Sequence, residues 1–136
     1  MKISEMSFFQ GIDSKVIGEI EAECARQDYR SEEIIFDKGD PAEFLYFLET
    51  GRIELVFKEK SDTICTIGSP GDVFGWSAIV EDGVYTSSAI SRTQTRVMYI
   101  SRQAIKRIFN THPEAAVIFY QRIGTVFSKR LTTVIS

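Results

Sequence analysis

The residues best suited to chemistry lie in the stretch 71–91, where a glycine turn precedes a short apolar run and a hydroxyl-rich strand follows. Gly75 frees the backbone, and residues 76–80 predict one or two turns of helix. The first N–H groups of such a helix point outward and hydrogen-bond anions. Hydroxyls at positions 86–88 add further donors. The pattern predicts either an anion-binding site or a plain turn between two strands.

Catalytic and metal chemistry find little support in the sequence. His112 is the only histidine, so the clustered ligands of a metalloenzyme are missing. No Gly-x-Ser-x-Gly motif surrounds the serines at 87 and 88, and no nucleophile with its base and orienting acid is marked. We therefore expect a protein that is not an enzyme and holds no metal, and we interpret His112 as a surface or capping residue.

The composition indicates one globular domain covering residues 1–136. A net charge of −3 and a pI near 5.2 argue against a nucleic-acid-binding surface. No apolar run reaches the roughly 18 residues that cross a bilayer, and no signal peptide is visible. Cys24 and Cys65 lack metal-binding spacing and suit reduced thiols. We expect a cytoplasmic location and no membrane partner.

Helical periodicity marks both ends of the chain. Asp13 or Ser14 is a suitable N-cap for a helix that runs to about Gln27. Ser101 can cap a short helix, and Pro113 suits the first turn of a long one from about residue 114 to the end. The apolar face of this last helix contains Ala116, Phe119, Ile123, Val126, Phe127, Leu131 and Val134. Half of the face should cover the rest of the domain, and the remainder either packs within the chain or pairs with a second copy.

Residues 28–100 have the pattern of short strands separated by Gly and Pro turns. The runs 44–48 and 53–57 flank a turn that contains Gly51, which predicts a β-hairpin. Many short strands at regular spacing favour a sandwich or barrel. The predicted fold is therefore mainly β, an antiparallel β-roll or jelly-roll barrel, with an N-terminal helical cap over 1–27 and C-terminal helices over 101–136.

Three motifs, in order along the chain, resemble landmarks of the cyclic-nucleotide-binding domain family, whose members include the catabolite activator proteins. They are Asp-Lys-Gly-Asp-Pro-Ala at 37–42, Leu-Tyr-Phe-Leu-Glu-Thr-Gly at 45–51 and Gly-Asp-Val-Phe-Gly at 71–75. The resemblance implies a β-roll with a phosphate-binding cassette at the third motif. It also implies a cyclic nucleotide ligand, cAMP or cGMP, and a homodimer formed through the last helix.

The cassette departs from the family pattern at two positions. Family members typically carry a Glu that holds the ribose and an Arg that neutralises the phosphate. Here Trp76 takes the place of the Glu, and Thr86, or Ser87 with one insertion, takes that of the Arg. Residues 61–91 contain no Lys or Arg, and loss of a bidentate Arg weakens binding by on the order of a hundredfold. We expect a weak or non-standard ligand, or another small anion. Trp76 either fills the ribose space or forms a stacking wall.

The resemblance implies a regulatory ligand-sensing module. Activator-type relatives continue into a helix-turn-helix domain that these residues do not contain, so no direct nucleic-acid contact is expected. The alternative is a degenerate domain that binds no nucleotide and acts as a dimerisation or scaffold module. The expected ligand-binding residues belong to the glycine turn and the strand after it: Phe74, Gly75, Trp76, Ser77, Ala78, Thr86, Ser87, Ser88 and Ala89.

Overall fold

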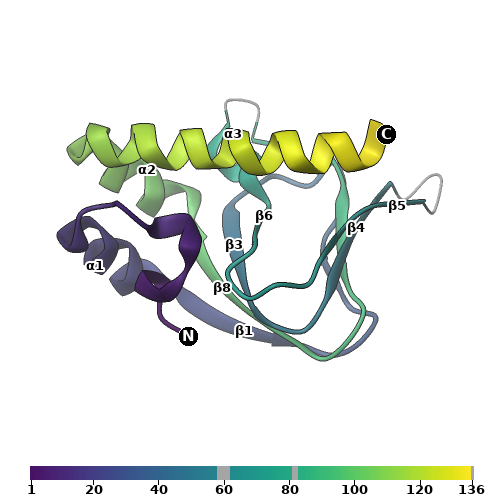
Figure 1. Cartoon of the computed structure of the whole chain (residues 1–136). Helices are drawn as coiled ribbons and strands as arrows, with labels where there is room; N and C mark the ends of the chain where they lie inside the picture. The colour runs from purple at the N-terminus through teal and green to yellow at the C-terminus, as the bar shows by residue number, and fades with distance from the viewer. Residues whose placement is uncertain (58–61, 81–82, 136) are drawn as a thin grey trace.

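The chain folds into two four-stranded antiparallel sheets that form a β-roll, with helices at one side and across its top (Figure 1). The computed structural model describes residues 1–57, 62–80 and 83–135, and the side chains of these except 62, 64 and 132–135. The mainly β prediction is confirmed. The described strands are β1 (Ala25–Tyr29), β2 (Ile34–Phe36), β3 (Phe44–Thr50), β4 (Ile53–Phe57), β5 (Asp62–Ile67), β6 (Val73–Phe74), β7 (Ser88–Ser91) and β8 (Thr95–Ser101).

The first sheet has the order β1-β8-β3-β6 and the second the order β2-β7-β4-β5. In the first sheet β3 pairs with β8, so that Leu45 lies opposite Ile100 and Phe47 opposite Met98. Five consecutive residues of β3 are buried, because helical segments cover the face that points away from the roll. A strand buried on both faces reads as a continuous apolar run, which is how residues 44–48 appear in the sequence.

The predicted hairpin between residues 44–48 and 53–57 is wrong. Strands β3 and β4 belong to different sheets, and β4 pairs instead with β5 and β7. Gly51 between them has a φ of +101°, and a Cβ at this position would lie 2.5 Å from Thr95 Oγ1. The turn therefore serves as a corner that carries the chain from one sheet to the other.

The N-terminal helix α1 (Ser14–Glu23) begins as predicted, since the Asp13 side chain accepts a hydrogen bond from the backbone N–H of Lys15. It ends at Glu23, four residues before the predicted end near Gln27. The reason is strand pairing: β1 begins at Ala25 and lies antiparallel to β8. Ser101 caps α2 (Arg102–Thr111) as predicted, its Oγ accepting the Ala104 N–H at 3.1 Å.

Two 3₁₀ turns, η1 (Ile3–Glu5) and η2 (Ser7–Phe9), precede α1. They place an aromatic cluster between the roll and the last helix. The Phe8 ring lies 4.9 Å from that of Phe119, and the Phe9 ring lies 5.1 Å from that of Phe47. These contacts fix the N-terminal cap against both β3 and the last helix.

The last helix, α3 (Pro113–Ile135), lies across the top of the roll (Figure 1). One side of it is buried through Ala115, Phe119 and Ile123. The other side carries exposed apolar side chains: Val117, Tyr120, Phe127 and Leu131. The predicted apolar face is thus split between the two sides, and the side chain of Val134 lies outside the described residues.

Neither α3 nor any other helix in the described ranges combines the length and apolar character of a membrane span. The same ranges hold no group of three or more His, Cys, Asp or Glu side chains placed to bind a metal ion.

Candidate ligand-binding site

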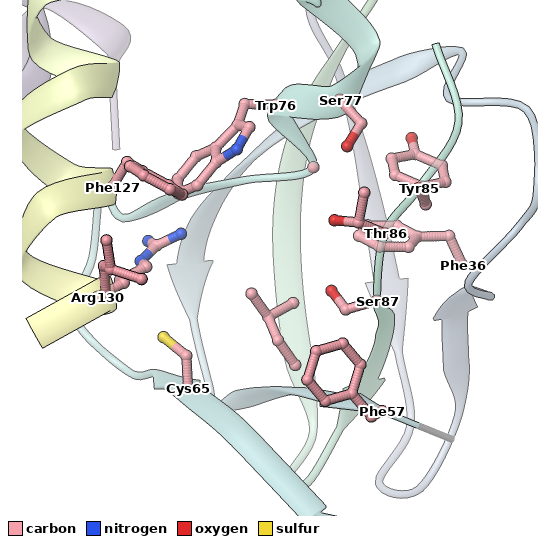
Figure 2. Close-up of a pocket in the computed structure, with 13 residues that line it drawn as sticks. Phe36, Phe57, Cys65, Trp76, Ser77, Tyr85, Thr86, Ser87, Phe127 and Arg130 are labelled. Carbon is pink, nitrogen blue, oxygen red and sulfur yellow. The ribbon is translucent and has the colours of Figure 1, made fainter. Parts of the chain in front are cut away.

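A cavity of about 290 Å³ lies between the second sheet, the glycine turn and α3 (Figure 2). Its walls come from segments far apart in the sequence: β2, β4, β5, the turn at residues 75–77, the segment 85–87 and residues 127–131 of α3. The lining residues are Phe36, Leu55, Phe57, Cys65, Gly75, Trp76, Ser77, Tyr85, Thr86, Ser87, Phe127, Arg130 and Leu131.

The glycine turn is shaped by Gly75, which caps the short 3₁₀ helix η3 (Trp76–Ile79) in the left-handed conformation, with φ +75° and ψ +27°. A Cβ at this position would lie 3.0 Å from Tyr46 Cδ2 and 3.3 Å from Phe36 Cε2. Both the backbone angles and the close approach to the two rings require glycine. This conformation directs Trp76 and Ser77 toward the cavity.

The floor of the cavity is an aromatic stack. The rings of Phe36 and Tyr85 lie 3.7 Å apart and nearly parallel, at 10°. The Tyr85 hydroxyl donates to the carbonyl oxygen of Phe44 at 2.6 Å, and burial raises the pKa of Tyr85 to about 12. Tyr85 therefore stays neutral near pH 7 and acts as a fixed, apolar surface.

Trp76 forms one wall and is held there by two side chains of α3. Its ring meets that of Phe127 edge-on, with centroids 6.2 Å apart. The guanidinium carbon of Arg130 lies 4.8 Å from the Trp76 ring centroid, within the range of a cation–π interaction. The indole thus stands at the boundary between η3 and α3 and leaves the space beneath it open.

Arg130 brings a positive charge to the cavity that the prediction from the sequence missed. One terminal nitrogen, Nη2, donates to the Val73 carbonyl oxygen at 2.5 Å, and the other, Nη1, is buried without a hydrogen-bond partner among the described residues. Burial lowers the pKa of Arg130, an effect that Cys65 and Asp72 oppose. The available signal was a charged residue on the apolar face of the last helix, four residues after Val126.

Five of the nine expected ligand-binding residues line the cavity: Gly75, Trp76, Ser77, Thr86 and Ser87. The hydroxyls of Thr86 and Ser87 make no hydrogen bond within the described part of the chain, and both point into the cavity (Figure 2). These groups are therefore available to a bound molecule as donors or acceptors.

The other four expected residues are not brought to the cavity. Phe74 and Ala78 are buried in the core, where the Phe74 ring stacks on Tyr46 at 5.0 Å. Ala89 is fully buried in β7. The Ser88 hydroxyl is occupied, because it donates to the Asp37 carboxylate at 3.2 Å and accepts from the backbone N–H of Lys38. Alternation of side chains along the strand separates Ser88 from Ser87.

His112 lies far from this cavity, at the C-terminal end of α2. It is the C-cap residue of that helix, its backbone N–H donating to the Ile108 carbonyl oxygen. The imidazole Nε2 lies 2.6 Å from a Glu19 carboxylate oxygen in α1. Of the two roles predicted for His112, surface residue or capping residue, the C-cap position corresponds to the second.

The profile of the family described as "Cyclic nucleotide-binding domain" matches residues 26–112, well over half of the chain. The matched range includes seven of the eight strands completely and the whole glycine turn. The chain therefore belongs to the cyclic nucleotide-binding domain family, as its motifs indicated.

Individual relatives agree with this assignment. A CRP-like cAMP-activated global transcriptional regulator of Mycobacterium tuberculosis is 24% identical over 131 residues, covering 95% of this chain and 57% of that protein. A putative cyclic nucleotide-binding protein from Geobacter metallireducens has a TM-score of 0.83 at 23% identity, covering 93% of this chain and 92% of that one. The c-di-GMP-responsive global regulator CLP of Xanthomonas campestris has a TM-score of 0.73 at 29% identity, covering 88% of this chain and 60% of that one.

The chain spans a little over half the length of the curated regulator that it matches. The matched region is the cyclic nucleotide-binding domain, and the M. tuberculosis and X. campestris relatives are named as regulators.

Proposed function

We propose that residues 1–136 act as one non-enzymatic, ligand-sensing domain that binds a small anionic molecule of the cyclic-nucleotide class. The observation that carries this proposal is the open cavity at the family's cassette position, closed on one side by α3. Its walls combine aromatic rings with free hydroxyls and one guanidinium. Such a lining suits a ligand with an apolar ring and an anionic group.

The proposed mechanism is a change in how α3 sits on the cassette turn. Four contacts now join them. Phe127 and Arg130 each pack against Trp76, and Arg130 also donates to the Val73 carbonyl. The Tyr120 hydroxyl donates to the Ile79 carbonyl at 3.3 Å. A ligand in the cavity touches both sides of this junction. It shifts the arrangement only through unequal affinity for the two positions of α3.

We also propose that the domain forms a homodimer through the exposed side of α3. Val117, Tyr120, Phe127 and Leu131 follow one another at intervals of three, seven and four residues, the spacing of a coiled-coil seam. Val117 is 57% exposed and Phe127 49% exposed, although both are apolar. Covering such a stripe by a second copy removes apolar surface from water.

Calorimetric titration with cAMP and cGMP tests ligand binding. Saturable heat at micromolar nucleotide, with a higher melting temperature, is the expected result, because the cavity supplies donors and ring surfaces. An absence of heat and of any melting shift at millimolar nucleotide would support the alternative, a scaffold domain without a nucleotide. The exposed stripe of α3 and the missing cassette arginine are the observations that favour that alternative.

Light scattering after size exclusion tests the dimer. The wild-type chain is expected to have twice the mass of one copy, and Val117→Glu to be monomeric because it places a charge in the seam. Thr125→Glu adds the same charge to an exposed position of α3 that is neither three nor four residues from a member of the stripe, and should leave the dimer intact. A monomeric wild type at about 100 μM would overturn the dimer proposal, since that concentration exceeds the dissociation constant of most specific dimers.

A further inference from the structure

Arg130 is the one formally charged side chain among the described residues that line the cavity. No carboxylate of a described residue lies within salt-bridge distance of it, and Asp72 acts on its charge only from farther away. Its Nη1 is buried with no acceptor among those residues. A buried guanidinium donor without a partner is costly, because it has lost its water and gained nothing in exchange.

Two hydroxyls face this guanidinium from the other side of the cavity. Figure 2 shows Arg130 pointing inward from α3, and the oxygens of Thr86 and Ser87 pointing toward the same space from the roll. An oxyanion placed between them receives N–H donors from one wall and O–H donors from the other. No Asp or Glu of the described chain lines the cavity, so no carboxylate among those residues repels the oxyanion there.

The remaining walls set the shape of the rest of the ligand. Trp76 and Phe127 form one aromatic wall, and the Phe36–Tyr85 stack forms the floor. Aromatic surfaces of this kind accept planar rings by offset or edge contacts. The geometry therefore favours a ring joined to an oxyanion.

We infer that Arg130 is the anion-binding residue of the cavity, and that the ligand is a planar aromatic ring that carries an oxyanion held between Arg130, Thr86 and Ser87. This inference rests on the proposed function of the same cavity. Arg130 supplies, from the last helix, the positive charge that family members supply from the strand after the cassette. The oxyanion then links α3 directly to the roll, since its partners lie on both.

Binding at this position is measurable through Trp76, the only tryptophan of the chain. Its fluorescence is followed during titration with cAMP, cGMP and phenyl phosphate, and with adenosine as an uncharged ring. Arg130→Met removes the charge but keeps an apolar stem, and Arg130→Lys keeps the charge but loses the planar fork. Lys129→Gln is the matched control, because it removes a positive charge from the adjacent exposed position of α3.

The wild type is expected to give a saturable change with cAMP or cGMP and with phenyl phosphate. Arg130→Met should weaken binding of each anion by at least about tenfold, since hydrogen bonds to a charged group are lost. The affinity of Arg130→Lys for the anions should lie between those of the wild type and Arg130→Met. Lys129→Gln should bind the anions as tightly as the wild type does. Adenosine, which has no charge, should bind the wild type and Arg130→Met with equal affinity. Circular dichroism and the melting temperature verify that each variant is folded.

The outcomes separate this inference from the proposed function. If a folded Arg130→Met binds cAMP as tightly as the wild type, the role of Arg130 is overturned while the ligand-sensing function stands. If phenyl phosphate binds in an Arg130-dependent manner and neither nucleotide binds, the nucleotide function is overturned while the role of Arg130 stands. If no anion binds the wild type, both are overturned.

Discussion

At position 75 the backbone adopts a left-handed conformation beside two aromatic rings, so this single residue controls the shape of the cassette turn. Gly75→Ala should lower the free energy of unfolding by about 2 kcal/mol, from the strained φ and the crowding against Tyr46 and Phe36. Urea denaturation measures the change.

Gly18→Ala is a control for which we expect the free energy of unfolding to rise instead of fall. Gly18 lies within α1, and a Cβ there would meet nothing within 4 Å. Because alanine favours helix over glycine, the same substitution should stabilise the protein by about 0.5–1 kcal/mol. Equal effects of the two substitutions would contradict a special requirement for glycine at position 75.

The two thiols give a second prediction at this scale. Burial raises the pKa of Cys24 to about 12, and burial also raises the pKa of Cys65, which lines the cavity. Only the thiolate reacts with iodoacetamide, so a raised pKa leaves less thiolate at neutral pH and slows alkylation. The rate for each thiol should go on rising with pH beyond about 8.5, where a free thiol has its midpoint.

A bound ligand should slow alkylation of Cys65, because it fills the cavity in front of the thiol, and should leave Cys24 unchanged. Mass spectrometry of the labelled peptides, with and without saturating cAMP, separates the two sites. Equal protection of both thiols would indicate a general change of stability instead of occupancy of the cavity.

Sequence patterns predicted the cassette turn but only part of the cavity. Trp76, Thr86 and Ser87 were found because they lie in one short segment with recognisable turn residues. Arg130 was not found, since it follows Trp76 by more than fifty residues and reaches the cavity only because α3 folds back across the roll. The burial of Ser88 and Ala89 depends on strand register, which composition does not specify.

At the scale of elements, the helices were predicted better than the strand pairing. Caps and helical periodicity are local, so Asp13, Ser101 and Pro113 marked helix starts correctly. The corner at Gly51 looks like a hairpin turn in the sequence, because both need a glycine between apolar runs. Which strands then pair depends on contacts between segments that are distant in the sequence, β3 with β8 and β4 with β7, while β4 also pairs with the next strand, β5.

Two arginines connect the N-terminal cap to the C-terminal helices. We expect substitution of each to lower the free energy of unfolding by a different amount. Arg122 of α3 donates to the carbonyl oxygens of Phe8, at 2.6 Å, and of Gln10. Arg122→Met leaves these carbonyls without their charged donor, so it should lower the free energy of unfolding by about 1–3 kcal/mol.

Arg107→Met is the comparison. Arg107 of α2 forms an ion pair with Glu23 of α1 at 2.8 Å, with side chains 62% and 45% exposed. Because solvent screens such a pair, Arg107→Met should lower the free energy of unfolding by no more than about 0.5 kcal/mol. Urea denaturation of both variants tests the ranking. An Arg107→Met effect as large as that of Arg122→Met would show that the cap is held by charge and not by the carbonyl contacts.

For the whole molecule, α3 takes part in every function proposed here. It packs on the aromatic cluster of the N-terminal cap through Phe119, closes the cavity through Arg130, and exposes an apolar stripe. Phe127 and Leu131 belong both to the cavity lining and to the stripe. The proposed ligand and the proposed second copy of the chain would therefore contact the same two residues.

This shared helix predicts that ligand binding and dimerisation are thermodynamically coupled. A ligand held by Arg130 adds a contact that keeps this part of α3 on the roll, and a dimer seam needs the same placement. Saturating cAMP should therefore lower the dissociation constant of the dimer. By linkage, each site of the dimer should bind cAMP more tightly than the monomeric Val117→Glu variant, typically by about 5–150-fold in allosteric proteins. Because a dimer holds two ligands, the dissociation constant of the dimer should fall by the square of that factor.

Sedimentation equilibrium with and without cAMP measures the change in the dissociation constant of the dimer. Titration of the wild type and of Val117→Glu with cAMP measures the change in ligand affinity. Thr125→Glu, which places its charge away from the seam, should match the wild type in both. Val117 does not line the cavity. A weaker affinity in its glutamate variant therefore reports the lost dimer and not a damaged site. If cAMP binds but changes neither the dimer dissociation constant nor the affinity difference between the two proteins, the predicted coupling is wrong. In that case α3 closes the cavity without any effect of the ligand on the dimer seam.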